Sequence, residues 1–216
     1  MKKIFTLIAA VAFAATASAQ VLSFDTKYDK GSIPSSFTKG DLVLTVTDTD
    51  GKLAVDANSA YFGTSESYVS FDYRLKTGGK SSSKNNLTLT LPSDGVLKVY
   101  ARTGSNGATD RNIVLTQNET ELVNKILLES EAVKATIGEE EKNVYPVISA
   151  EAKKGDVVIT YPVGSINFYA FELVNATGVS TIIAPKADGK TYNLSGVQVS
   201  ENAKGLKIKN GKKFVK

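Results

Sequence analysis

Six side chains in the middle of the chain have the chemistry to bind a polar or acidic ligand: Arg74, Lys76, Lys98, Tyr100, Arg102 and Arg111. Guanidinium groups bind carboxylates through two parallel hydrogen bonds, and a tyrosine ring can stack on a sugar face or on an arginine. A surface that gathers these groups would suit an acidic polysaccharide. The strands that carry them decide whether they gather.

The stretch FDYRLKTGG, which begins at Phe71, predicts where the first two cations lie. Apolar residues alternate with charged ones, and successive side chains of a strand point to opposite faces of a sheet. We therefore expect Phe71, Tyr73 and Leu75 in the core. Arg74 and Lys76 then face water together.

The run from Val96 to Arg102 alternates in the same way. It predicts that Leu97, Val99 and Ala101 point inward, while Lys98, Tyr100 and Arg102 point outward. If these strands are neighbours, the six side chains form one ligand-binding face. The alternative is that the cations only cover the sheet surface and pair with acidic residues, of which the candidates are Asp72, Asp110 and Glu172.

Composition argues against catalysis. The chain has no histidine and no cysteine, which removes the usual general base, the Ser-His and Cys-His arrangements and the common zinc sites. Two carboxylates could still hydrolyse a glycosidic bond, but the densest run, Glu139 to Glu141, is expected to be a solvated loop. We predict no enzyme and no catalytic residue; a lyase that uses a basic residue and calcium is the third alternative.

No cofactor is expected. Asp48-Thr49-Asp50-Gly51 resembles the start of a calcium loop, but the residues after it lack the further oxygen ligands, so a tight turn is the better interpretation. Asp25 and Asp29 leave room for a structural calcium ion that no motif specifies.

Short alternating runs separated by turn residues predict an all-β fold, an antiparallel β-sandwich of jelly-roll type with a small C-terminal β unit. Three turns are expected to close hairpins, joining residues 42–46 to 53–55, 87–91 to 96–102, and 156–161 to 166–174. Residues 120–128 have spacing that fits either a short helix or a strand with a bulge, with the strand favoured. Tyr61 and Phe62, near a turn, are the freer aromatic residues, although core burial is favoured for them too.

Residues 1–19 have the three parts of a cleaved secretory signal: a basic end, an apolar core and a small-residue cleavage site. We predict a β-sandwich domain at 20–175, a linker at 176–190 and a C-terminal β segment at 191–216. Residues 20–185 carry 16 cations and 20 anions, whereas the tail is basic. A folded domain with this charge distribution lacks the basic surface that binds nucleic acid, so no nucleic-acid partner is expected. The signal predicts a secreted or cell-surface protein.

Two segments resemble known families. The residues from Tyr68 to Gly79, with Leu97 to Arg102, Asp110-Arg111 and Gly164 to Phe171, resemble the β-sandwich modules attached to secreted pectate lyases and related polysaccharide-degrading enzymes. That resemblance implies a role in carbohydrate binding or in packing against a catalytic domain. The tail, Tyr192 to Gly196 and Lys204 to Lys216, is similar to C-terminal sorting segments of the type IX secretion system, which implies transfer across an outer membrane by that machinery.

The sequence therefore predicts a secreted, non-catalytic carbohydrate-binding protein, with acidic polysaccharide as the candidate ligand class. The alternative is a structural or adhesion protein of the cell envelope that has no glycan ligand. The expected partners are accordingly polysaccharide or cell-envelope components, together with the secretion machinery.

Overall fold

The computed structural model describes residues 19–175, 191–193, 198–200, 206–209 and 212–215. The chain divides into two compact units, Met1–Thr177 and Gly178–Lys216. The predicted signal, apart from Ala19, and the predicted linker at 176–190 lie outside the described residues.

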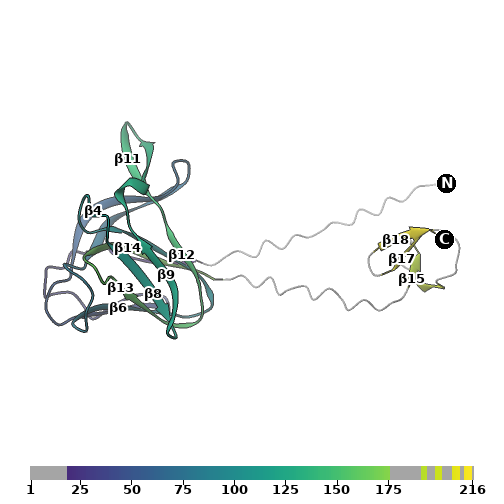
Figure 1. Ribbon diagram of the computed structural model, residues 1–216, viewed down its shortest axis with the longest axis horizontal. Coiled ribbons are helices and arrows are strands. Elements are labelled where there is room, and N and C mark those ends of the chain that lie inside the picture. The colour runs from purple at the N-terminus through teal and green to yellow at the C-terminus, as the bar shows by residue number, and fades with distance from the viewer. Residues whose placement is uncertain (1–18, 176–190, 194–197, 201–205, 210–211, 216) are drawn as a thin grey trace. The chain divides into compact units, whose positions relative to one another are not determined.

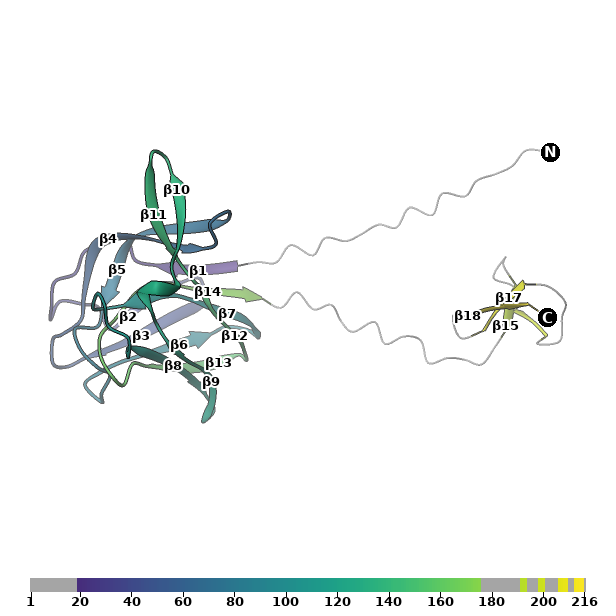
Figure 2. The same cartoon turned by 45° about the horizontal axis from the view of Figure 1, so that its top comes forward.

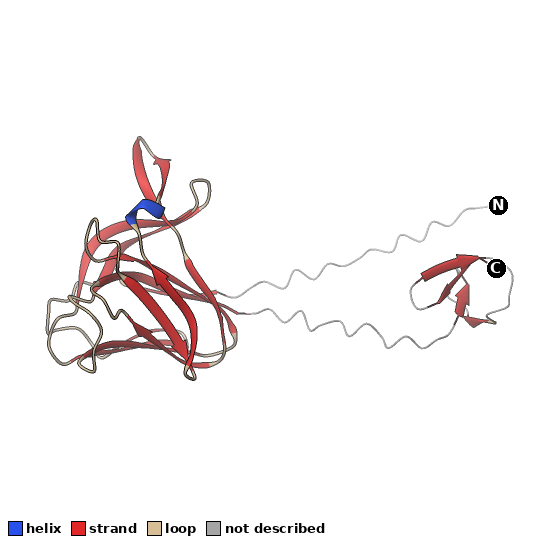
Figure 3. Ribbon diagram, viewed as in Figure 1, coloured by secondary structure: helices blue, strands red, loops and turns tan. Residues whose placement is uncertain are grey.

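The first unit consists of two stacked sheets, so the predicted all-β sandwich is confirmed (Figure 1; Figure 3). The eight-stranded sheet contains, in spatial order, β10 (Val133–Ile137), β11 (Glu140–Tyr145), β4 (Ala54–Gly63), β5 (Tyr68–Lys76), β14 (Ile166–Asn175), β7 (Gly95–Thr103) and β12 (Ile148–Ala152), with β1 (Ala19–Ser23) also paired to β14. The six-stranded sheet contains β2 (Ser36–Lys39), β3 (Leu42–Asp48), β6 (Asn85–Leu91), β13 (Gly155–Thr160), β8 (Asn112–Gln117) and β9 (Thr120–Ile126). The pairings are antiparallel except for a short parallel one between β11 and β4.

The second unit is a four-stranded antiparallel sheet. Its strands are β16 (Gln198–Val199), β15 (Thr191–Asn193), β17 (Leu206–Lys209) and β18 (Lys212–Val215), in that spatial order. Among the described residues, no helix is long and apolar enough to cross a membrane.

The three turns that were expected to close hairpins instead carry the chain from one sheet to the other. β3, β6 and β13 belong to the six-stranded sheet, whereas the strands that follow them, β4, β7 and β14, belong to the eight-stranded sheet. The turn chemistry itself is present: Gly51 has a φ of +62°, and the Asp48 carboxylate accepts hydrogen bonds from the backbone N–H groups of Lys52 and Leu53. Such a turn reverses the chain equally well within a sheet or between sheets, so the hairpin prediction was wrong.

Residues 120–126 form a strand with a bulge. β9 pairs with β8, and the register shifts because Leu122 has no partner between Glu121 and Val123. The strand interpretation of this segment is confirmed.

The main core fills the space between the sheets. Leu75, Leu97, Val99 and Ala101 all belong to it and are buried, as the alternation predicted. Tyr73 packs against the same core from a partly buried position. Phe71 does not, because it packs against a second apolar cluster.

This second cluster lies on the other face of the eight-stranded sheet, and we call it the outer cluster. Its buried members are Ala60, Phe62, Tyr100, Tyr145, Tyr169 and Ala170. A β-bulge in β14 creates it: Phe168 pairs with Ala101 but Ala170 pairs with Tyr100, so Tyr169 is the extra residue. Tyr169 and Ala170 therefore both point away from the main core.

Phe62 is the centre of the outer cluster. Its ring centroid lies 5.1–6.2 Å from those of Tyr169, Tyr100, Tyr145 and Phe71. The β10–β11 hairpin, which supplies Tyr145, projects from the body beside β4 (Figure 2). The outer cluster thus ties this hairpin to the sheet.

We predict that Phe62→Ala lowers the free energy of unfolding by about 3–5 kcal/mol, because it leaves a cavity among four rings. Urea denaturation of the purified protein measures this. Val163→Ala, at an exposed turn position, is the control and should change stability by less than about 0.5 kcal/mol. A Phe62→Ala variant as stable as the control would contradict an outer cluster that holds the hairpin.

Candidate functional site

The predicted basic face lies on the outer face of the eight-stranded sheet. Lys76 and Arg102 are both cross-strand partners of Asn167 in β14, so all three side chains point to the same side. Arg74 lies two residues before Lys76 and shares that side. Lys98 and Tyr100 precede Arg102 on β7 with the same alternation. Five of the six predicted residues are therefore on one face.

Arg74 and Lys76 share one carboxylate. The Arg74 Nε lies 2.8 Å from Oδ1 of Asp56, and the Lys76 Nζ lies 2.7 Å from its Oδ2. Burial by itself would raise the pKa of Asp56, but the hydrogen bonds from these two cations outweigh it and hold that pKa below its usual value. The two cations are thus engaged within the protein.

Lys98 and Tyr100 converge on Glu172. The Lys98 Nζ lies 3.3 Å from Oε1 of Glu172, and the Tyr100 hydroxyl donates a short hydrogen bond to Oε2. Tyr100 is only 4% exposed, because Phe62 and Phe71 pack against its ring. Its predicted face is correct, but a ring this buried has no surface for stacking on a sugar.

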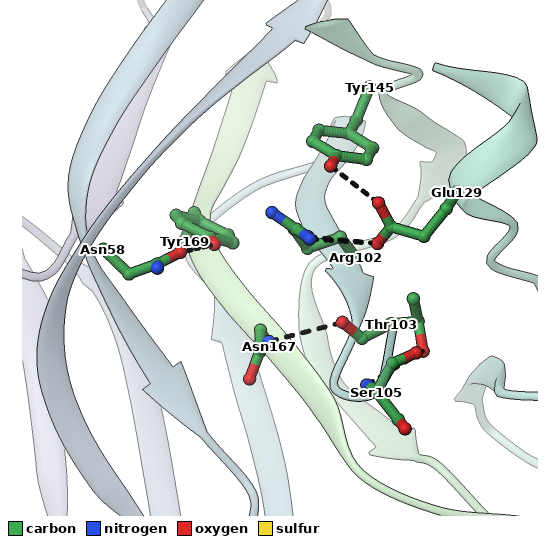
Figure 4. Close-up of polar contacts among 8 residues, drawn as sticks. All are labelled: Asn58, Arg102, Thr103, Ser105, Glu129, Tyr145, Asn167 and Tyr169. Atoms are coloured by element: carbon green, nitrogen blue, oxygen red, sulfur yellow. Dashed lines mark hydrogen bonds and ion pairs between the residues drawn. The ribbon is translucent and has the colours of Figure 1, made fainter. Parts of the chain in front are cut away.

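Arg102 is held in a similar way by Glu129, in the short 3-10 helix Glu129–Glu131 (Figure 4). Its Nη2 lies 3.1 Å from Oε1 of Glu129, while the Tyr145 hydroxyl donates a 2.7 Å hydrogen bond to Oε2. The guanidinium also lies 4.6 Å from the centroid of the Tyr145 ring, within cation–π distance. Burial and then the bond to Glu129 raise the pKa of Tyr145 to about 12, so Tyr145 stays protonated at neutral pH and can donate this hydrogen bond.

Tyr169, the bulge residue, lies between the two arginines. Its hydroxyl donates a 2.6 Å hydrogen bond to Oδ1 of Asn58 (Figure 4). Burial raises its pKa, and the positive charges of Arg102 and Arg74 offset part of that rise. The tyrosine hydroxyl therefore interacts with both guanidinium groups as well as with Asn58.

Arg111 does not join this face. It precedes β8 in the six-stranded sheet, and its guanidinium forms an ion pair of 3.1 Å with the neighbouring Asp110. The group lies over Gly164, where a Cβ atom would come within 2.5 Å of the Arg111 Cζ. Arg111 therefore packs on the β13–β14 turn.

A recess opens beside Arg102, between β4 and the β10–β11 hairpin, and we call it the hairpin recess. It has a volume of about 240 Å³. Tyr61 contributes a partly exposed ring and Tyr145 a largely buried one, and Ser59 and Asn143 contribute a hydroxyl and an amide. Its charged lining residues are Arg102, Lys134, Glu141 and Lys142.

Sequence reasoning missed the acidic partners and the hairpin. Asp56 and Glu129 are far in sequence from the arginines they bind, and neither was predicted as a partner. The predicted partners were Asp72, Asp110 and Glu172. Of these, Glu172 binds Lys98 and Tyr100 rather than Arg74 or Arg102. The alternation of residues along β4 could have identified Asp56, because it places the Asp56 side chain on the outer face, directly opposite Arg74 on β5.

The described residues contain no group of three or more Asp or Glu side chains arranged to hold a metal ion. Asp25 accepts a hydrogen bond from the Thr26 hydroxyl, and Asp29 pairs with Lys27. Glu139, Glu140 and Glu141 are exposed, as expected, but only Glu139 lies in a turn; Glu140 and Glu141 begin strand β11, so the loop expectation was wrong for them.

No protein-family model matches the chain, and neither does any curated protein. Among solved structures it matches the catalytic domain of a GH87 alpha-1,3-glucanase in complex with tetrasaccharides, at 9% identity and a TM-score of 0.32. The match covers 62% of this chain and 28% of that one. A likeness this weak carries no information about fold or activity.

We predict that Asp56→Asn lowers the free energy of unfolding at pH 7 by about 1–2 kcal/mol, because two cations lose their shared partner. Asp56 has a lower pKa in the folded than in the unfolded protein. Its contribution to the free energy of unfolding is therefore fully present above the pKa of the unfolded state, and it is lost as the pH falls through the pKa of the folded state. The difference between variant and wild type should therefore shrink as the pH falls below about 4.

Urea denaturation at several pH values measures this difference. Asp72→Asn is the matched control, because Asp72 is exposed and accepts a hydrogen bond from Ser59 without an ion pair to a described residue. It should change stability by less than about 0.5 kcal/mol. An equal, pH-independent effect of both substitutions would show that the ion pairs of Asp56 contribute nothing.

Proposed function

We propose that the protein is a non-catalytic carbohydrate-binding protein that holds a polysaccharide in the hairpin recess. One observation carries the proposal: the partly exposed Tyr61 ring, an amide, a hydroxyl and four charged side chains line one recess on the sheet. Sugar rings offer hydroxyl groups at their edges and C–H groups on their faces, which such a lining complements.

The residues of the predicted basic face have different roles in this proposal. Arg102 lines the recess and contacts the ligand. Tyr100 lies in the outer cluster beneath the surface, and Asp56 binds both Arg74 and Lys76, so these residues support the face. An acidic polysaccharide was expected because free cations were expected, and the ion pairs weaken that reason.

Binding without catalysis is supported by the state of the carboxylates. Asp56, Glu129 and Glu172 each accept hydrogen bonds from one or two cations or hydroxyl groups of the protein. A general acid needs a raised pKa and access to the substrate. The pKa of Asp56 is shifted downward.

The second candidate is a structural or adhesion protein of the cell envelope without a glycan ligand. The ion pairs favour it, since surface cations that are already paired need no external partner. In both cases we propose export through the N-terminal signal, followed by sorting through the C-terminal segment.

Affinity electrophoresis in gels that contain single polysaccharides tests the proposal. We expect the wild-type protein to be retarded by at least one polysaccharide. Lys134→Ala with Asn143→Ala should weaken that retardation about tenfold, because the two side chains are cross-strand partners in the recess.

Lys154→Ala with Asn124→Ala is the matched control: it changes the same residue types and the same charge at exposed positions outside the recess. Its retardation should equal that of the wild type. If no gel retards the wild-type protein, the cell-envelope scaffold is the better account.

A further inference from the structure

A second recess lies on the same side of the molecule, at the tip of the β4–β5 hairpin. This tip recess has a volume of about 210 Å³. Phe62 and Tyr100 line it from the outer cluster, and Ser67 and Ser149 add hydroxyl groups. Tyr68 is the exposed aromatic residue in its wall, with 39% of its surface in water.

Two tyrosines that contact each other connect the two recesses. Tyr61 lines the hairpin recess and Tyr68 lines the tip recess. The two rings touch edge to face, with centroids 5.8 Å apart and planes at 83°. Arg102 and Tyr100, two residues apart on β7, also belong to one recess each. The recesses are therefore neighbours.

Most of the cations that line the two recesses are paired within the protein. The lining cations are Lys98, Arg102, Lys134 and Lys142. Glu172, Glu129 and Glu140 pair with three of them, and Glu141 lines the hairpin recess. Three of the four lining cations are thus paired with a carboxylate of the protein, and Glu141 is the acidic residue in the lining itself.

This pairing matters for the ligand. A carboxylate that pairs with Lys98, Arg102 or Lys142 would also approach the glutamate that already binds that cation, and it would lose part of its hydration. A neutral sugar has no such cost. Its hydroxyl groups can donate to the glutamates and accept from the cations, and these charge-assisted hydrogen bonds are the stronger kind.

We infer that the ligand is a neutral, linear glycan whose consecutive sugars occupy the hairpin recess and the tip recess, one on each side of the Tyr61–Tyr68 pair. This inference rests on the proposed function and names its substrate class. Tyr68 is the stacking platform of the second position.

Titration calorimetry with neutral oligosaccharide ladders (gluco-, manno- and xylo-oligosaccharides) and with oligogalacturonates tests the inference. We expect binding to one neutral ladder, with an affinity that rises from the monosaccharide to the longer members. Tyr68→Ala should weaken binding of the long members about tenfold and leave the shortest binder unchanged. Tyr68→Phe keeps the ring and should bind like the wild type.

The outcomes separate the inference from the proposed function. Exclusive binding of oligogalacturonates, an affinity independent of length, or full affinity in a folded Tyr68→Ala variant would overturn the inference and leave carbohydrate binding in place. No heat with any ladder, together with no retardation by any polysaccharide gel, would overturn both. Circular dichroism of each variant confirms that it is folded.

Discussion

The arrangement of the outer face depends on strand β14, which is buried on both of its sides. Phe168 and Phe171 point into the main core, while the bulge turns Tyr169 and Ala170 together into the outer cluster. A face that packs against aromatic rings needs a cover, and the β4–β5 and β10–β11 hairpins supply it through Phe62, Phe71 and Tyr145. The recesses lie where this cover meets the sheet.

Covering the face also changes its electrostatics. Partly buried cations must be paired, since an unpaired charge away from water is costly. Asp56, Glu172 and Glu129 meet this need, and two of these carboxylates also fix the hydroxyl of a buried tyrosine. The same ion pairs that neutralise these cations give the surface oriented donors and acceptors. This combination suits a ligand rich in hydroxyl groups better than one rich in charge.

The sequence predicted which side of β7 is apolar, because side chains alternate with a period of two, but on β5 the same rule misplaced Phe71, which packs in the outer cluster. Leu97, Val99 and Ala101 point inward and Lys98, Tyr100 and Arg102 outward, as expected. Alternation does not say what covers the other side, so the burial of Tyr100 was not predictable. Nor does an Asp-Gly turn say which sheet the next strand enters. Bulges and distant pairings, such as Arg102 with Glu129, depend on the assembled sheet.

The central claim is that glycan binds across the outer face. Mapping of backbone amide shifts by nuclear magnetic resonance during titration with a neutral oligosaccharide tests it most directly. The account predicts that shifts concentrate at residues 59–69, 98–102, 134 and 141–149, around the two recesses. Shifts confined to the six-stranded sheet, or a spectrum unchanged by every oligosaccharide tried, would contradict it.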